Sequence, residues 1–299
     1  MGKTDDPLDL KYPAIFPKVE AITKEVVGLG GIPIDRVGSG KKLLRSVDEK
    51  FTPFDARRVW NHSGKVRWNG RKPVMGTTAW ERGEGCLYLS EGIISLTKEG
   101  IFYGFKDFAE KTAKGASLNH IVYDLPEENI ISDAFYGKIV YVYELTSTKN
   151  LADLDPKNSF ISAICSRLDS DKDIRDVLAR EGHKNAAEML FQGDDYSLAR
   201  PLGGSVLAVP NVDGLIVDSA RIYTEGDDRN LAIKPDGPND CVNSLRAVEK
   251  IQFIPNAAHP GVDQIVVTDL SKVPKSSTTP RTGAGSKDES GKPHTQYHS

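Results

Sequence analysis

The chain has 299 residues, of which 38% are hydrophobic and 27% charged, and its formal net charge is −3. This composition is typical of a globular protein with one large domain or two modest ones. The sequence contains no dense Lys/Arg block of the kind that binds nucleic acid, and no run of about 18 apolar residues that could span a membrane. We therefore expect a cytoplasmic protein that binds neither nucleic acid nor membrane.

Composition divides the chain into three parts. Residues 1–50 form a lead segment with thinner apolar patterning, which predicts one helix and loops packed on the main body. Residues 51–270 are rich in short apolar runs and form the main domain. Residues 271–299 are rich in Pro, Gly, Ser and Thr and have almost no apolar residues, which predicts a disordered tail.

Short β-rich runs dominate the main domain. Strands are expected in the runs that begin at His120, Lys138, Ser205, Asp213, Asn230, Lys250 and Gln264. Helical spacing of apolar residues predicts one helix after Ser90 and a second over about 174–192. Strands outnumber helices and do not alternate regularly with them, so the pattern predicts a mixed α+β fold.

Several familiar motifs are incomplete. The stretch "GLGGIPIDRVGSGKK" lacks the glycine and the hydroxyl that a phosphate-binding loop would need at Asp35 and Lys42, so a flexible loop is expected. The histidines show no metal-ligand spacing outside the tail. Cys86, Cys165 and Cys241 lie far apart and have none of the short spacings of a zinc site, so three reduced thiols in a cytosolic protein are expected. No metal site is expected.

The stretch "CLYLSEGIISLTKEG", residues 86–100, predicts a strand that ends in a turn, and two glutamates follow that strand. If Ser90 opens a helix, Glu91 lies in its first turn, where the helix dipole favours a carboxylate. Glu99 would then lie roughly 12 Å further along the axis. Glycosidase carboxyl pairs lie about 5 to 9.5 Å apart, so any catalytic role for Glu99 is that of a single carboxylate. Periodicity alone makes Glu99 an ordinary boundary residue.

An ordered set of motifs resembles the RES-domain toxin family. The set comprises "RRVW" at Arg57, "VRWNG" at Val66, "CLYLSEGIISLTKEG" and "DGLIVDSARIYTEGDDRNLAI", and it covers roughly residues 55–235. This family consists of bacterial toxins that destroy NAD+. The resemblance implies a compact fold similar to that of ADP-ribosyltransferases, NAD+ as the substrate, and an antitoxin or immunity protein as the partner.

The resemblance assigns candidate site residues by motif. They are Arg67, Tyr88, Glu99 and Ser219, with Arg58 and Asn230 at secondary positions. An insertion between Trp68 and Tyr88 departs from the family pattern. It brings in Arg82, which could replace Arg67 as the clamp for an anion.

The chemistry of NAD+ cleavage suits these residue types. An arginine offers two parallel donors to a pyrophosphate, and a tyrosine can stack on nicotinamide. One carboxylate, here Glu99, could stabilise positive charge on the ribose as the glycosidic bond breaks, and Ser219 could orient Glu99 or the ribose. Two alternatives remain open: a mono-ADP-ribosyltransferase that modifies a macromolecule, and a non-catalytic binding module.

Overall fold

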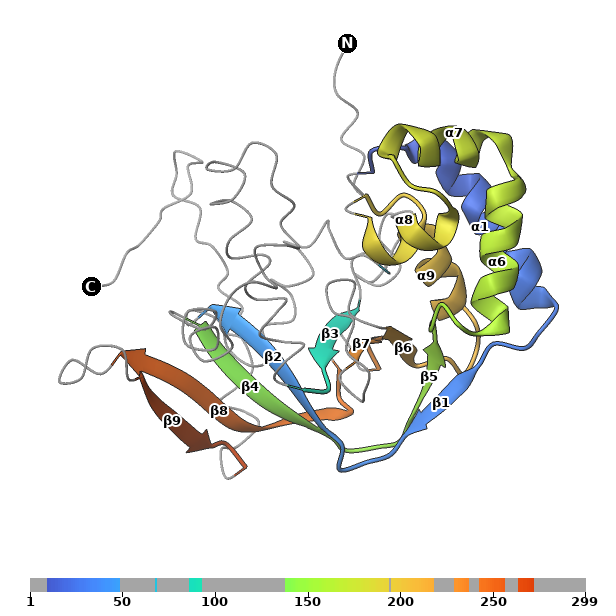
Figure 1. Ribbon diagram of the computed structural model, residues 1–299. Coiled ribbons are helices and arrows are strands. Elements are labelled where there is room, and N and C mark those ends of the chain that lie inside the picture. Colours follow the sequence, from blue (N-terminus) through green and yellow to red (C-terminus); the bar gives the residue numbers. More distant parts are fainter. Residues whose placement is uncertain are drawn as a thin grey trace, which may run out of the picture.

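A nine-stranded sheet and a group of helices make up the fold (Figure 1). The computed structural model describes residues 10–48, 68, 86–92, 138–193, 195–217, 229–236, 242–255 and 263–271. The strands are β1 (Ile34–Val37), β2 (Lys42–Asp48), β3 (Leu87–Ser90), β4 (Lys138–Leu145), β5 (Lys149–Asp153), β6 (Gly214–Val217), β7 (Asn230–Ile233), β8 (Leu245–Pro255) and β9 (Asp263–Asp269). Their order is β1-β5-β6-β7-β3-β2-β4-β8-β9, and β5–β6 is the one parallel pair among them. The predicted α+β class is confirmed.

The helices gather at the end of the sheet formed by β1, β5 and β6 (Figure 1). They are the short 3-10 helix η1 (Pro13–Ile15), α1 (Phe16–Gly28), α6 (Ser159–Ser170), α7 (Lys172–Glu181), α8 (Ala186–Gln192) and α9 (Ala199–Leu207). Side-chain oxygens of Asn158, Asp171 and Asn185 accept backbone N–H bonds at the starts of α6, α7 and α8. These caps satisfy amides that have no partner within the helix.

Two short connections force the sheet to curl. Residues 38–41 join β1 to β2, although β5, β6, β7 and β3 lie between these strands in the sheet. A flat sheet would separate β1 from β2 by five spacings, about 24 Å, and such a link reaches only about 17 Å. Residues 146–148 join β4 to β5 in the same way, and Gly40 donates to the Leu145 carbonyl at 2.8 Å. We call residues 38–41 and 146–148 the bridging ribbon.

The two faces of the curled sheet carry different cores. One face packs against α1, α6, α7, α8 and α9 through residues such as Ala152, Leu215 and Ala232. The alternate residues of the same strands, including Leu151 and Ile216, join a second cluster with residues of β2, β4 and β8. Side chains of a strand alternate between faces, so β3 and the strands from β5 to β7 are buried on both sides.

The structure corrects three expectations and confirms others. Strands β4, β6, β7, β8 and β9 occur where strands were predicted. The strand expected from Ser205 is wrong, because this segment ends helix α9. The single helix expected over 174–192 is two helices, broken at Gly182 in a left-handed conformation (φ 76°). The lead segment contains helix α1 as predicted, but strands β1 and β2 replace the expected loops.

Three other predictions lie outside the described residues. They are the strand at His120, the helix after Ser90 beyond Gly92, and the tail from residue 272 onward. The division at residue 50 also stays a prediction, and β1 and β2, which precede it, pair with β5, β3 and β4 of the same sheet.

Candidate functional site

Three strand ends meet in one row across the sheet. Ser90, the last residue of β3, pairs with Asn230, the first residue of β7, and Asn230 pairs on its other side with Val217, the last residue of β6. The Ser90 hydroxyl donates to Oδ1 of Asn230 at 2.8 Å, and both side chains are buried. We call Ser90, Asn230 and Val217 the strand-end row. Strands β3 and β6 both end at this row, and β7 begins there.

Tyr88 lies on the same face as Ser90, because the two residues are two apart on β3. It pairs with Ala232 of β7 and packs at the edge of the helical core. The predicted residues Tyr88 and Asn230 are therefore brought together on adjoining strands. The remaining candidates, Glu99, Ser219, Arg67, Arg58 and Arg82, lie outside the described residues.

Trp68 is anchored between Tyr88 and the helices. Its backbone N–H donates to the Tyr88 hydroxyl at 3.0 Å, and its buried ring packs against Phe191 with ring centroids 5.5 Å apart. Its carbonyl lies so close to α9 that a Cβ on Gly203 would come within 1.8 Å of the oxygen. Only a glycine accommodates this approach. The chain next to Arg67 is thus held by three separate contacts.

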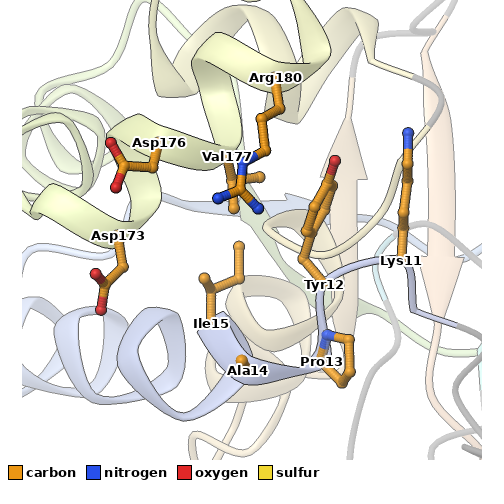
Figure 2. Close-up of a pocket in the computed structure, with 9 residues that line it drawn as sticks. All are labelled: Lys11, Tyr12, Pro13, Ala14, Ile15, Asp173, Asp176, Val177 and Arg180. Atoms are coloured by element: carbon orange, nitrogen blue, oxygen red, sulfur yellow. The ribbon is translucent and has the colours of Figure 1, made fainter.

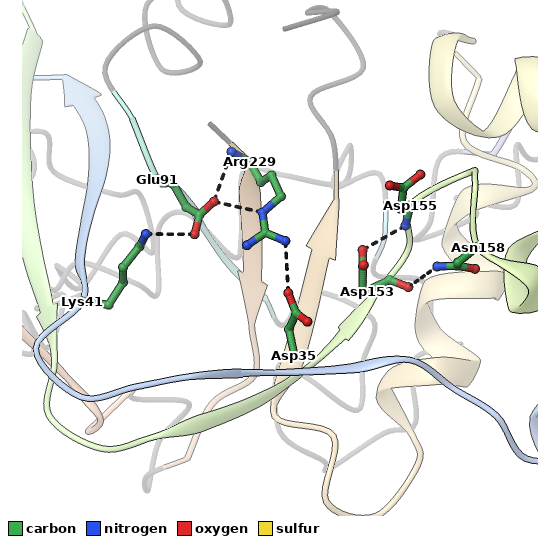
Figure 3. A network of polar contacts seen from close by, with 7 residues as sticks. All are labelled: Asp35, Lys41, Glu91, Asp153, Asp155, Asn158 and Arg229. Atoms are coloured by element: carbon green, nitrogen blue, oxygen red, sulfur yellow. Dashed lines mark hydrogen bonds and ion pairs between the residues drawn. The ribbon is translucent and has the colours of Figure 1, made fainter. Parts of the chain in front are cut away.

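Glu91 occupies a different environment from the one predicted. It directly follows β3, and its side chain is only 4% exposed. Its carboxylate accepts from Nε of Arg229 at 3.0 Å and pairs with Nζ of Lys41 at 3.1 Å (Figure 3). Arg229 also pairs through Nη1 with Asp35 at 3.1 Å. The buried carboxylate thus has two partly exposed cations as partners, whereas the helix on which the expected dipole effect depends lies outside the described residues.

Charge around Arg229 favours its protonated form. Burial lowers the pKa of Arg229, but the hydrogen bonds and charges of Glu91 and Asp35 outweigh burial and raise the pKa above its ordinary value. Burial raises the pKa of nearby Asp153, and Asp35 adds to this effect. Asp153 also accepts the backbone N–H of Asp155 at the start of the loop to α6 (Figure 3).

A pocket lies away from the strand-end row, among residues of η1 and α7. Figure 2 shows a pocket of about 310 Å³ between η1 and α7, lined by Lys11, Tyr12, Pro13, Ala14, Ile15, Asp173, Asp176, Val177 and Arg180. Cations and carboxylates both line it. At its rim, Glu181 accepts from Tyr12 and from Lys11, and these bonds lower the pKa of Glu181. Neither Tyr88 nor Asn230, the predicted site residues that the structure describes, lines this pocket.

Other chemistry finds little support in the described part of the chain. Cys86 and Cys165 are free and buried, and burial raises the pKa of both thiols, that of Cys165 to about 12. A high thiol pKa disfavours the reactive thiolate. Within the described ranges no three His, Cys, Asp or Glu side chains are grouped as metal ligands, and none of the helices is both long and apolar enough to cross a membrane.

Sequence reasoning missed four residues of this region: Trp68, Ser90, Glu91 and Arg229. All four lie inside the quoted motifs, and alternation along "LYLS" could have placed Ser90 on the Tyr88 face. Nothing in the sequence pairs Glu91 with Arg229. No known family model matches the chain, and no curated protein matches its sequence.

Proposed function

We propose that the chain is an NAD+-consuming enzyme of the RES type, which cleaves the bond between nicotinamide and ribose. One observation carries the proposal: the strand-end row. Ser90 and Val217 flank Asn230 in this row. Glu99 follows Ser90 in the sequence, and Ser219 follows Val217. Residues that the family resemblance combines into one site therefore follow the ends of strands that lie close together in the sheet.

The Trp68 anchor supports the same proposal. The motifs that carry Arg67 and Tyr88 meet through the hydrogen bond from Trp68 to Tyr88, two residues that are 20 apart in the sequence. A residue that binds the pyrophosphate and a residue that stacks on the nicotinamide must lie no further apart than the length of one NAD+ molecule. The α+β fold with its curled sheet is consistent with the proposed similarity to ADP-ribosyltransferases.

The proposed mechanism assigns one task to each residue. Arg67 or Arg82, together with Arg58, binds the pyrophosphate, Asn230 contributes to the binding of NAD+, and Tyr88 presents its ring to the nicotinamide. As the glycosidic bond breaks, its electron pair moves to the nicotinamide nitrogen, and positive charge develops on the ribose. Glu99 stabilises that charge and Ser219 orients Glu99 or the ribose. Water then yields ADP-ribose, or phosphate yields a phosphorylated ADP-ribose.

Two rival functions differ from this one in what they release. A mono-ADP-ribosyltransferase also releases nicotinamide but transfers ADP-ribose to a macromolecule, which mass spectrometry of exposed cell extract detects. A binding module releases none. An antitoxin or immunity protein is the expected partner, and the site of action is expected to be the cytoplasm of the producing cell or of a target cell.

The test is nicotinamide release by the purified chain, with water, phosphate or cell extract as the acceptor. Glu99→Gln keeps the side chain's size and removes its charge, so turnover should fall at least ~10²–10³-fold while NAD+ binding changes little. Glu144→Gln is the control, because Glu144 forms an exposed ion pair with Arg246 on β4 and β8. Absence of nicotinamide with all three acceptors contradicts the proposal, as does full activity of Glu99→Gln.

A further inference from the structure

Glu91 and Arg229 lie one residue beyond the strand-end row and are bonded to each other there. The Glu91 N–H donates to the Arg229 carbonyl at 2.8 Å, which extends the β3–β7 ladder by one step. The Arg229 backbone N–H and Nε both donate to Oε2 of Glu91, at 3.4 and 3.0 Å. The same two residues are thus joined by backbone and by side chain directly beside Ser90 and Asn230.

The pair works from the opposite face of the sheet. Alternation places Ser90 and Asn230 on the helix-covered face, so their neighbours Glu91 and Arg229 project to the other face. Figure 3 shows them between strands β3 and β7 and the segment that carries Asp35 and Lys41. The ion pairs of Glu91 and Arg229 can therefore fix the positions of Ser90 and Asn230 and leave the helix-covered face beside these two residues unoccupied.

The contacts also tie the row to the bridging ribbon. Lys41 of the ribbon pairs with Glu91 at 3.1 Å, and Asp35 of β1 pairs with Arg229 at 3.1 Å. Strands β3, β6 and β7 have only four residues each. Such short strands form few ladder hydrogen bonds, so side-chain contacts contribute a large share of what fixes their ends.

The residue types indicate a role in geometry rather than in stability alone. Glu91 is buried and Arg229 is partly buried, and an ion pair that loses hydration in this way is often no more stabilising than an apolar pair of the same size. A guanidinium does, however, fix direction, since its planar donors bind partners at set angles. Here one guanidinium binds carboxylates from two segments at once.

We infer that Glu91 and Arg229 are positioning residues, which hold the ends of β3 and β7 so that Ser90 and Asn230 meet in the geometry that binds NAD+. This inference rests on the proposed function for the identity of the ligand. Neither residue contacts the reacting atoms in this role. A displaced row should weaken binding of NAD+ even where the chain remains folded.

The first experiment measures the Kd for NAD+ in a Glu99→Gln background, so that the ligand is not consumed. Glu91→Gln, Arg229→Lys and Arg229→Met should each raise Kd by about ten- to a hundredfold, since displacements of about 1 Å have effects of this size. Arg229→Lys keeps the charge but loses the planar fork, so a large effect there identifies positioning. All titrations are run where circular dichroism shows every variant to be folded.

Two controls separate positioning from stability. Glu144→Gln breaks an exposed ion pair whose 3.0 Å separation matches that of Glu91 and Arg229. Val177→Ala removes buried apolar volume from α7, which should lower Tm. Both should leave Kd within about twofold of the background value, because neither touches the row.

The second measurement is amide hydrogen exchange of residues 86–92 and 229–233. Glu91→Gln should accelerate exchange there and leave β4 and β8 unchanged. If NAD+ binds and Kd does not change in the pair variants, the inference is overturned and the proposed function stands. If no NAD+ binds to the parent, the proposed function is overturned; faster exchange then still supports the role in holding the strands, and unchanged exchange overturns that role as well.

Discussion

The two halves of the sheet are stabilised by different means. Strands β4 and β8 are eight and eleven residues long and pair over most of their length, with exposed ion pairs such as Arg246–Glu144 at their surface. Strands β3, β6 and β7 have four residues each and lie where the helix-covered half begins. Long strands are held by their ladders, whereas these short strands depend on individual anchors, and the candidate site is built on the short strands.

The largest effect is expected from Gly203→Ala, which disrupts the contact between the Trp68 backbone and helix α9. The new methyl group would come within 1.8 Å of the Trp68 carbonyl oxygen, a backbone atom that can move only with its chain. We expect a loss of about 3 kcal/mol or more in the free energy of unfolding, at the upper end of overpacking effects. Urea unfolding measures it.

A glycine with free space around its Cα provides the control for this substitution. Gly28 ends α1, and a Cβ there would meet nothing within 4 Å. Gly28→Ala should change the free energy of unfolding by less than about 1 kcal/mol. Equal effects of the two substitutions would show that Trp68 does not lie against α9.

Tyr88→Phe tests another contact of Trp68, its hydrogen bond to Tyr88, with a smaller expected effect. It removes the hydroxyl that accepts the Trp68 N–H at 3.0 Å and leaves that donor without this partner. The loss should be about 2 kcal/mol, the typical cost of leaving a buried polar group unsatisfied. Thermal unfolding measures it, with Tyr12→Phe as the control, since Glu181 there keeps Lys11 as a partner. A larger loss in Tyr12→Phe than in Tyr88→Phe would contradict the anchor.

The long-strand half and the strands of the site were largely predictable from the sequence. Apolar runs with β-branched and aromatic residues, such as "KIVYVYEL" and "NLAIKP", mark β4 and β7 clearly. The segment "SVLAVP" was predicted as a strand because a short apolar run does not distinguish a strand from a buried helix. Burial of α9 on all sides explains this error, since all nine of its residues are buried.

The anchors were harder to predict than the strands. Tyr88 and Asn230 follow from motifs, but their neighbours act through contacts between segments far apart in the sequence. Glu91 and Arg229 are 138 residues apart, and Trp68 and Gly203 meet only because α9 packs against the sheet. No local pattern encodes such contacts. The sequence "KNLAD" of β5 was also missed, because its polar residues give no strand alternation.

Acid should weaken a third anchor on the short strands. Asp236, which follows β7, accepts from Nζ of Lys149 at 2.7 Å and from the N–H groups of Asn243 and Ser244. Burial raises the pKa of Asp236, but these bonds outweigh burial and lower it below its ordinary value. A carboxylate with a lowered pKa contributes stability above its unfolded pKa of about 4, and the contribution is lost as pH falls through the folded pKa.

The measurement for this anchor is urea unfolding between pH 7 and pH 2. At pH 7, Asp236→Asn should cost about 1.5 kcal/mol, the size of a charged hydrogen bond. The difference from the parent should shrink below about pH 4. Parallel pH curves for parent and variant would show that Asp236 does not titrate differently in the folded state.

The smallest expected effect concerns Gly182, where the predicted single helix over 174–192 is broken. If that helix were continuous, Gly182→Ala would stabilise the chain by about 1 kcal/mol, because alanine is the better helix former. In the structure Gly182 ends α7 with φ 76°, a conformation that disfavours any side chain, and nothing lies within 4 Å of a Cβ there. Gly182→Ala should therefore destabilise by about 1 kcal/mol through backbone strain alone. Gly182→Asn should cost less, since asparagine tolerates this conformation. Chemical denaturation separates the two cases by the sign of the change in the free energy of unfolding. If Gly182→Ala is stabilising, the prediction of a single continuous helix is correct after all.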